Sequence, residues 1–307
     1  MSSYNAILLI AFGGPTAPEE IRPFLDRVLR GIPIPPERVE EVVRHYEAVG
    51  GKSPLNEITL RQAKALEKEL SAREICLPVF VGLRNASPFF TETLTRMASD
   101  GVKRALGFIL SSHQTEASWD RYKRNISDAI SEVGFTAPKV DYCEGWHDHP
   151  LFIETWAELI ASSLAETSAP ATTPIIFTAH SLPVAMAAKS PYVKQLETSA
   201  RLSAARLGHE RWSLAYQSRS GKPSDPWLEP DIRHTIRDLA SQSVSEIVVA
   251  PIGFVCDHVE VLYDLDIETK KVATDLRVRM LRVSCPNDHP TFIRMMAAVI
   301  GAKLLEM

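Results

Sequence analysis

The segment PIIFTAHSLP, at positions 174–183, carries the clearest strand signal in the sequence. Its apolar and β-branched residues predict a buried strand. The strand must end near Pro183, because proline has no backbone N–H for a sheet hydrogen bond. His180 therefore stands where the strand ends and the chain turns. Either this histidine is an ordinary turn residue, or the strand presents it as a functional side chain at the edge of a sheet.

Short apolar runs of the same kind recur along the chain and alternate with amphipathic helical patterns such as 18–31 and 59–72. Continuous apolar strands that alternate with helices are typical of parallel sheets covered on both faces. We therefore predict an α/β fold. The runs that predict strands are AILLIAF (6–12), LPVFVGL (77–83), ALGFIL (105–110), KVDYC (139–143), PIIFTAH (174–180), WSLAYQS (212–218), EIVVAPIGF (246–254) and VRMLRV (278–283).

The strand-like runs fall into two groups of four, separated by the Ala/Ser/Thr/Pro-rich stretch at 162–174. A length of 307 residues also favours two domains over a single core. We predict two Rossmann-like, doubly wound halves, each with a four-stranded parallel sheet. The expected N-terminal half covers 1–161 and the C-terminal half 174–285. The closing segment, 286–307, should form a helix that packs back on the N-terminal half.

Composition excludes several classes of protein. A formal net charge of −4 without a Lys/Arg run gives no sign of a nucleic-acid partner. No apolar segment approaches the ~20 residues of a membrane span, and the first residues lack the basic start of a signal peptide. The four cysteines lie far apart, which is typical of a reduced, cytoplasmic chain without disulfides. We expect a monomer, and the sequence leaves peripheral membrane contact open.

Ligands of open α/β sheets bind beyond the carboxyl ends of the strands. The first run is followed there by AFGGP at 11–15, which lacks the G-x-G-x-x-G spacing of a dinucleotide site and predicts a tight turn. His180 follows the first strand of the second half, and Glu260 follows its third. Both side chains could therefore reach one site, where a neutral imidazole accepts protons and a carboxylate holds a cation.

Glu260 begins a series of carboxylates that continues with Asp264 and Glu268. On an α-helix, at about 100° per residue, these three positions drift by only about 80° and form a ladder on one face. A solvated acidic stripe is the simpler interpretation. However, Val261, Leu262, Leu265 and Ile267 would bury the rest of such a helix, and like charges four residues apart repel one another. A divalent cation such as Fe²⁺ would offset that repulsion.

Five motifs in this order resemble those of the ferrochelatases, the family that inserts ferrous iron into a porphyrin at the end of haem biosynthesis. They are AFGGP, HYEAVGGKSPL, FTAHSLP, YQSRSG followed by PWLEPD, and PIGFVCDHVEVLYDLDIE. The resemblance covers essentially the whole chain. It implies two Rossmann-like halves with the porphyrin between them, and a lyase that bends the ring to expose its nitrogen lone pairs.

The same resemblance implies roles for individual residues. His180 matches the histidine that takes the pyrrole protons and binds metal, and Glu260 the carboxylate opposite it. Asp264 and Glu268 match an acidic path for the metal. Ser53 and Tyr122 match positions that contact the macrocycle in soluble bacterial members. Iron is then a substrate, and no permanent cofactor is expected.

Three positions depart from the pattern, and one of them is Asn85, where some relatives have histidine. Phe12 stands where some soluble members have a tyrosine that ligates the product iron, and His45 where some have an arginine suited to a propionate. The FGGP and HYEAVGG stretches favour coproporphyrin III over protoporphyrin IX as the substrate. The scattered cysteines predict no iron–sulfur cluster. The alternatives are a chelatase for another metal or tetrapyrrole, such as cobalt, and a haem- or porphyrin-binding protein without catalysis.

Overall fold

The computed structural model describes residues 4–31, 35–220 and 225–306. The chain forms two compact units. The first consists of Met1–Leu110, Ala117–Glu144 and Phe292–Met307, and the second of Ser111–Glu116 and Gly145–Thr291. Gly221, the last residue of the YQSRSG motif, lies outside the described residues.

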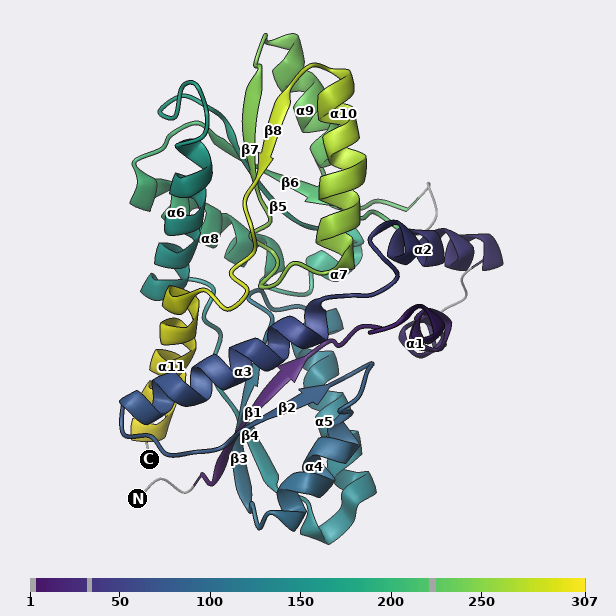
Figure 1. Ribbon diagram of the computed structural model, residues 1–307, viewed down its shortest axis with the longest axis vertical. Helices are drawn as coiled ribbons and strands as arrows, with labels where there is room; N and C mark the ends of the chain where they lie inside the picture. Colours follow the sequence, from purple (N-terminus) through teal and green to yellow (C-terminus); the bar gives the residue numbers. More distant parts are fainter. Residues whose placement is uncertain (1–3, 32–34, 221–224, 307) are drawn as a thin grey trace. The chain divides into compact units, whose positions relative to one another are not determined.

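The first unit is built on a parallel sheet with the strand order β2-β1-β3-β4. Its strands are β1 (Ala6–Ala11), β2 (Val79–Leu83), β3 (Arg104–Ile109) and β4 (Lys139–Tyr142). Its helices are α1 (Ile21–Val28), α2 (Pro36–Ala48), α3 (Leu55–Ala72), α4 (Phe90–Ser99), α5 (Arg121–Val133) and α11 (Pro290–Leu305), with the short turns η1 (Pro18–Glu20), η2 (Glu116–Asp120) and η3 (Gly134–Thr136) (Figure 1).

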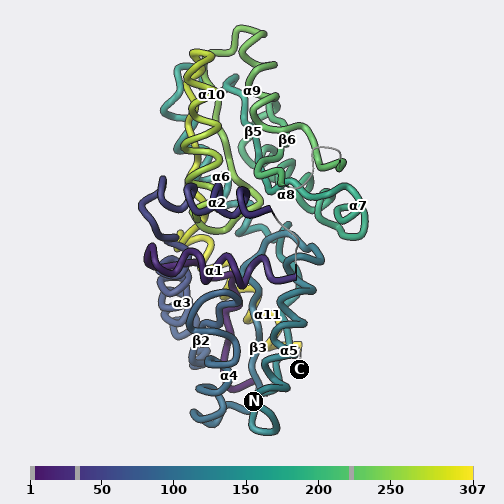
Figure 2. Tube along the Cα trace, turned by 90° about the vertical axis from the view of Figure 1, so that its right-hand side faces the viewer, coloured from purple at the N-terminus to yellow at the C-terminus, as the bar shows by residue number. Residues whose placement is uncertain are grey.

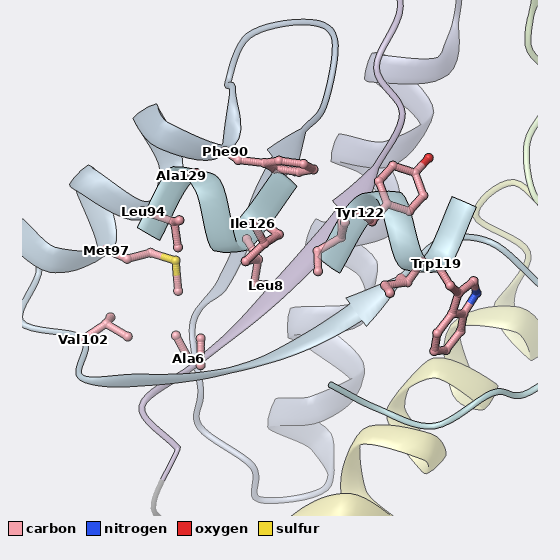
Figure 3. Packing of buried hydrophobic residues seen from close by; sticks show 13 residues of the cluster. Ala6, Leu8, Phe90, Leu94, Met97, Val102, Trp119, Tyr122, Ile126 and Ala129 are labelled. Carbon is pink, nitrogen blue, oxygen red and sulfur yellow. The ribbon is translucent and has the colours of Figure 1, made fainter. Parts of the chain in front are cut away.

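The residues of β1 are buried throughout, as its continuous apolar sequence predicts. Successive side chains of a strand point to opposite faces, so Ala6, Leu8 and Ile10 share one face of the sheet. There they pack in one cluster with side chains of α4 and α5 (Figure 3). The arrangement confirms a strand covered on both faces.

The second unit repeats this topology with the strand order β6-β5-β7-β8, again entirely parallel. Its strands are β5 (Ile175–His180), β6 (Trp212–Gln217), β7 (Glu246–Ala250) and β8 (Arg279–Arg282). Its helices are α6 (Pro150–Leu164), α7 (Val184–Ala187), α8 (Tyr192–Leu207), α9 (Ile232–Ser241), η4 (Val261–Thr269) and α10 (Lys270–Asp275). Figure 2 shows η4 and α10 as one continuous run beside α9.

All eight predicted runs contain a strand, which confirms the two four-stranded parallel sheets. The division of the chain differs from the expected boundary at 161. Helix α6 belongs to the second unit, where it packs against α8 and β7. Most of α11 is grouped with the first unit, where the backbone oxygen of Arg294 accepts a hydrogen bond from Arg73 (3.4 Å). None of the described helices has the length and apolar character needed to cross a membrane.

Candidate active site

His180 is the last residue of β5, and its backbone is held from several sides. Its carbonyl oxygen accepts a hydrogen bond from the hydroxyl of Tyr192 (3.0 Å). The next residue, Ser181, donates its N–H to the carbonyl of Gln217 on β6 (2.7 Å). Behind the strand end, a Cβ on Gly253 would stand 2.6 Å from the Cβ of Ala179, so the chain after β7 approaches as closely as only glycine permits. These contacts fix the backbone that presents His180.

The hydrogen bond made by the ring of His180 settles its tautomer. Nδ1 contacts the carbonyl oxygen of Ser181, and a carbonyl can only accept, so Nδ1 carries the proton. Nε2 of the neutral ring therefore keeps its lone pair. It faces Oε2 of Glu260 at 3.8 Å, beyond hydrogen-bond distance, and both side chains remain partly exposed (36% and 26%). Because these two atoms do not hydrogen-bond to each other, Nε2 is available to accept a proton and Oε2 is available to bind a cation.

Ser218 links Glu260 to Asp264. Its hydroxyl lies 2.7 Å from Oε1 of Glu260 and also contacts Oδ2 of Asp264. A hydroxyl has one proton, so two hydrogen bonds to carboxyl groups require a proton on one of the acids. Burial and the nearby Glu260 raise the pKa of Asp264 to about 7, against the lowering effect of the Ser218 hydroxyl. Asp264 therefore holds a proton up to near-neutral pH, and the Ser218 hydroxyl lies between the two acids.

The sequence predicts an α-helix for the acidic ladder, and the structure shows a different helix there. Residues Val261–Thr269 form a π-helix, η4, which then continues as α10. Its i→i+5 hydrogen bonds make a wider turn than that of an α-helix. Val261, Leu265 and Thr269 are the buried residues of η4, and their spacing of four is better aligned by the wider turn. Glu260, Asp264 and Glu268 have the same spacing of four residues and are aligned by the wider turn in the same way.

The structure brings His180, Glu260 and Asp264 together. Glu268 interacts with this group through its charge on Asp264. Glu268 is half-buried and contributes to the raised pKa of Asp264. Its charge and that of Asp264 also raise the pKa of Arg233, whose main partner is Asp231 (2.7 Å). Within the described ranges, no three or more His, Cys, Asp or Glu side chains gather closely enough to hold a metal ion.

The other predicted site residues belong to the first unit. Phe12 follows β1, and its ring meets Phe24 edge-on at 6.2 Å. His45 on α2 is half-buried, with Nε2 3.9 Å from Glu41, and burial lowers its pKa. Tyr122 is 6% exposed at the edge of the apolar cluster, with its hydroxyl directed away from Ile126 (Figure 3).

Ser53 has a structural role in the first unit. It is buried, its N–H bonds to the carbonyl of Pro15 (2.8 Å), and its hydroxyl accepts the N–H of Leu55 (3.3 Å). A Cβ on Gly14 would come within 2.8 Å of the Ser53 Cβ, so the FGGP turn packs tightly on it. A contact between substrate and Phe12, His45, Ser53 or Tyr122 stays a prediction.

Sequence reasoning missed two polar residues beside His180. Ser218 has a φ of 61°, a left-handed conformation that a serine sequence does not announce. Gln217 pairs with His180 across the sheet and is 3% exposed, yet neither atom of its amide has a hydrogen-bond partner among the described residues. A buried, unpaired amide is costly and is available to a ligand. Both residues belong to the YQSRSG motif, which was the only signal that could have indicated them.

Comparison with known proteins points to one family. A family model described as Ferrochelatase matches residues 4–304. A ferrochelatase of Rhodopirellula baltica is 42% identical, over 98% of this chain and 86% of its own length. A coproporphyrin III ferrochelatase of Mycobacterium ulcerans is 40% identical, over 97% of this chain and 86% of its own.

Solved structures resemble the chain in fold. SirB from Bacillus subtilis with Fe³⁺ superposes with a TM-score of 0.61, at 10% identity, over 97% of this chain and 95% of its own. CbiX, the terminal enzyme of siroheme biosynthesis in denitrifying bacteria, gives a TM-score of 0.58 at 13% identity, over 97% and 98%. At these identities the likeness shows the shared fold alone.

Proposed function

Because this chain belongs to the ferrochelatase family, we propose that it inserts Fe²⁺ into coproporphyrin III, with His180 and Glu260 as the groups that do the chemistry. The observation that carries the proposal is the free lone pair of His180 Nε2, which faces Glu260 Oε2 at 3.8 Å. A protein that only stores a porphyrin needs no proton acceptor opposite a cation ligand. Relatives from Mycobacterium and Nocardia, 40% and 41% identical and named coproporphyrin III ferrochelatases, support the choice of porphyrin.

Metal insertion exchanges protons for a cation. The two pyrrole N–H groups of the free porphyrin lose their protons as their nitrogen lone pairs bind Fe²⁺, so the ring takes up two positive charges and releases two. Nε2 of His180 accepts the two protons one after the other, since Nδ1 already carries a proton, and the resulting imidazolium passes each of them to solvent, to which the side chain is 36% exposed. Glu260 stabilises that cation and offers an oxygen to the entering iron.

Ser218 connects Glu260 to Asp264, a carboxyl group that holds a proton up to near-neutral pH. A proton shared along Asp264, Ser218 and Glu260 keeps only part of the acidic charge in the site while it is empty. The arrival of Fe²⁺ favours the ionised form of each carboxyl and drives that proton out. Glu268, at the outer side, would attract the cation before it reaches Glu260. Glu268, Asp264 and Glu260 thus form a path for the metal, and the negative charge of this path increases as the metal enters.

The remaining features of the proposal are a lyase reaction in the cytoplasm by a monomer, without an iron–sulfur cluster. Burial raises the pKa of the thiols of Cys143, Cys256 and Cys285, which opposes the thiolate form that cluster ligands need.

The test is anaerobic metallation of coproporphyrin III and of protoporphyrin IX with Fe²⁺, followed by the change in porphyrin absorbance. We expect faster turnover with coproporphyrin III, and no turnover above the uncatalysed rate with His180→Ala. Preference for protoporphyrin IX would overturn the choice of porphyrin. Tight porphyrin binding without accelerated metallation by Fe²⁺, Co²⁺ or Zn²⁺ would leave a carrier protein.

A further inference from the structure

Two arginines that form no ion pair with an acidic side chain among the described residues lie at the carboxyl edge of the first sheet. Arg84 follows β2 directly, as Phe12 follows β1. Helix α5, which carries Arg121, follows β3. In the order β2-β1-β3-β4 the connections leave β1 and β3 toward opposite sides, so this edge is the topological switch point at which α/β sheets bind ligands.

Arg84 is held in place by contacts that leave its terminal nitrogens unused. Its Nε donates to Oδ1 of Asn125 on α5 (2.8 Å), and its guanidinium carbon lies 5.7 Å from the centre of the Phe12 ring. The side chain is half-buried, and no carboxylate of the described residues forms an ion pair with it. Such a guanidinium is fixed in orientation and still offers the planar fork that binds a carboxylate.

Arg121, on α5, lies near enough to Arg84 for its charge to act on the Arg84 guanidinium. It precedes Asn125 by four residues, so both lie on one face of the helix, and Asn125 is the residue that holds Arg84. Arg121 is also half-buried and has no ion pair within the described part of the chain. After burial, the charge of Arg121 is the main cause that lowers the pKa of Arg84. On α5, the exposed Asp128 accepts a hydrogen bond from the amide of Asn125 (3.4 Å).

Two partly desolvated cations that repel each other are unfavourable unless an anion joins them. We propose that Arg84 and Arg121 together bind one carboxylate of the substrate, a propionate on the porphyrin ring, at the carboxyl edge of the first sheet. The inference rests on the proposed function, since it takes the porphyrin as the ligand. Phe12 contributes as the ring on which the Arg84 guanidinium rests.

The test measures porphyrin affinity without metal, by quenching of porphyrin fluorescence, for the wild type, Arg84→Gln, Arg121→Gln and the double variant. The probes are coproporphyrin III and its methyl ester, both in the same detergent at fixed salt. Arg96→Gln is the matched control, because Arg96 also lies over a phenylalanine ring, Phe80 at 5.6 Å, and pairs with Asp100 (3.8 Å).

We expect each single variant to bind the free acid about tenfold more weakly and the ester no more than about twofold more weakly. Because both arginines hold one carboxylate, the double variant should lose less than the product of the two single losses. Arg96→Gln should bind as the wild type does. Arg121 is on the helix surface, so a folding defect of Arg84→Gln would still leave Arg121→Gln as a test.

Equal losses for acid and ester, or wild-type affinity in both single variants, would overturn the carboxylate site. Failure of the proposed function looks different: the wild type would then insert no metal, whatever the affinities of the variants. A wild type that binds neither the acid nor the ester would refute both.

Discussion

Nε2 of His180 and Oε2 of Glu260 face each other across 3.8 Å at the carboxyl ends of β5 and of the segment after β7. The distance is too long for a hydrogen bond and too short for a porphyrin to pass between the two atoms. In the proposed reaction, both groups would therefore act from the same side of the ring. The proton acceptor and the cation ligand would be neighbours, so the pyrrole protons would leave and the iron would enter at the same position.

We expect His180→Ala to lower the rate of metal insertion by at least about a hundredfold, since it removes the imidazole whose Nε2 faces Oε2 of Glu260 at 3.8 Å. The measurement is the initial rate of anaerobic Fe²⁺ insertion at saturating porphyrin. His149→Ala is the matched control. His149 caps α6 by accepting the N–H of Leu151 (3.2 Å), so its loss should cost about 1 kcal/mol of stability and no activity. Equal activity in the two variants would remove His180 from the reaction.

Ser218→Ala should lower kcat about tenfold with little change in the KM for porphyrin, because the hydroxyl that joins Glu260 to Asp264 is lost. The pKa of Asp264 should rise further, since Ser218 now lowers it. The pH–rate profile should therefore shift to higher pH.

Ser218→Gly separates the hydroxyl from the backbone. Glycine accepts the φ of 61° without strain, so this variant should be at least as stable as Ser218→Ala and equally impaired in catalysis. If Ser218→Gly were fully active, the hydroxyl would have no part in the reaction.

The fold and the central pair could be predicted from the sequence because their signals are local. A buried apolar run such as IIFTAH at β5 predicts its strand, and His180 follows from where the run stops. The pairing of His180 with Glu260 needed only that both follow strands of one parallel sheet.

What the sequence could not predict depends on backbone geometry or on distant contacts. The four-residue spacing of Val261, Leu265 and Thr269 also fits an α-helix, so the sequence pattern alone did not predict the wider turn of the π-helix. The positive φ of Ser218 is unusual for any residue except glycine. The hydrogen bond between Arg84 and Asn125 joins positions 41 residues apart, which no local pattern encodes.

Asp264→Asn should stabilise the metal-free protein at pH 8, on the order of 2 kcal/mol. Folding raises the pKa of Asp264 from 3.8 to about 7, so the folded state binds a proton that the unfolded state has already released. The wild type should therefore lose this part of its stability as pH rises from about 4 to about 7. Urea unfolding at several pH values would measure it. If wild type and Asp264→Asn have parallel stability curves, Asp264 titrates normally.

Glu268→Gln should raise the KM for Fe²⁺ several-fold and leave kcat nearly unchanged, because Glu268 lies outside the pair that touches the ring and acts on the approach of the cation. The control is Asp275→Asn, the same loss of charge at the exposed end of α10, where Asp275 pairs with Lys271 (3.2 Å). The difference should shrink at high salt. A change in kcat with no change in KM would instead place Glu268 in the chemical step.

Gly253→Ala should destabilise the protein by about 1–3 kcal/mol and reduce activity beyond that loss, because the new methyl group would meet Ala179 at 2.6 Å and push the end of β5. His180 is the next residue, so the displacement reaches the site directly.

Gly301→Ala is the matched control for Gly253→Ala. Gly301 lies in α11, and a Cβ there would have its nearest neighbour, Ile75 Cδ1, at 3.8 Å. The methyl group fits, and the gain in helix propensity should stabilise the protein by up to about 1 kcal/mol without altering turnover. If the close approach of Gly253 holds His180 in place, the melting temperature should fall in Gly253→Ala and rise in Gly301→Ala, and metal insertion should slow only in Gly253→Ala. A Gly253→Ala variant with unchanged melting temperature and turnover would show that the end of β5 adapts freely.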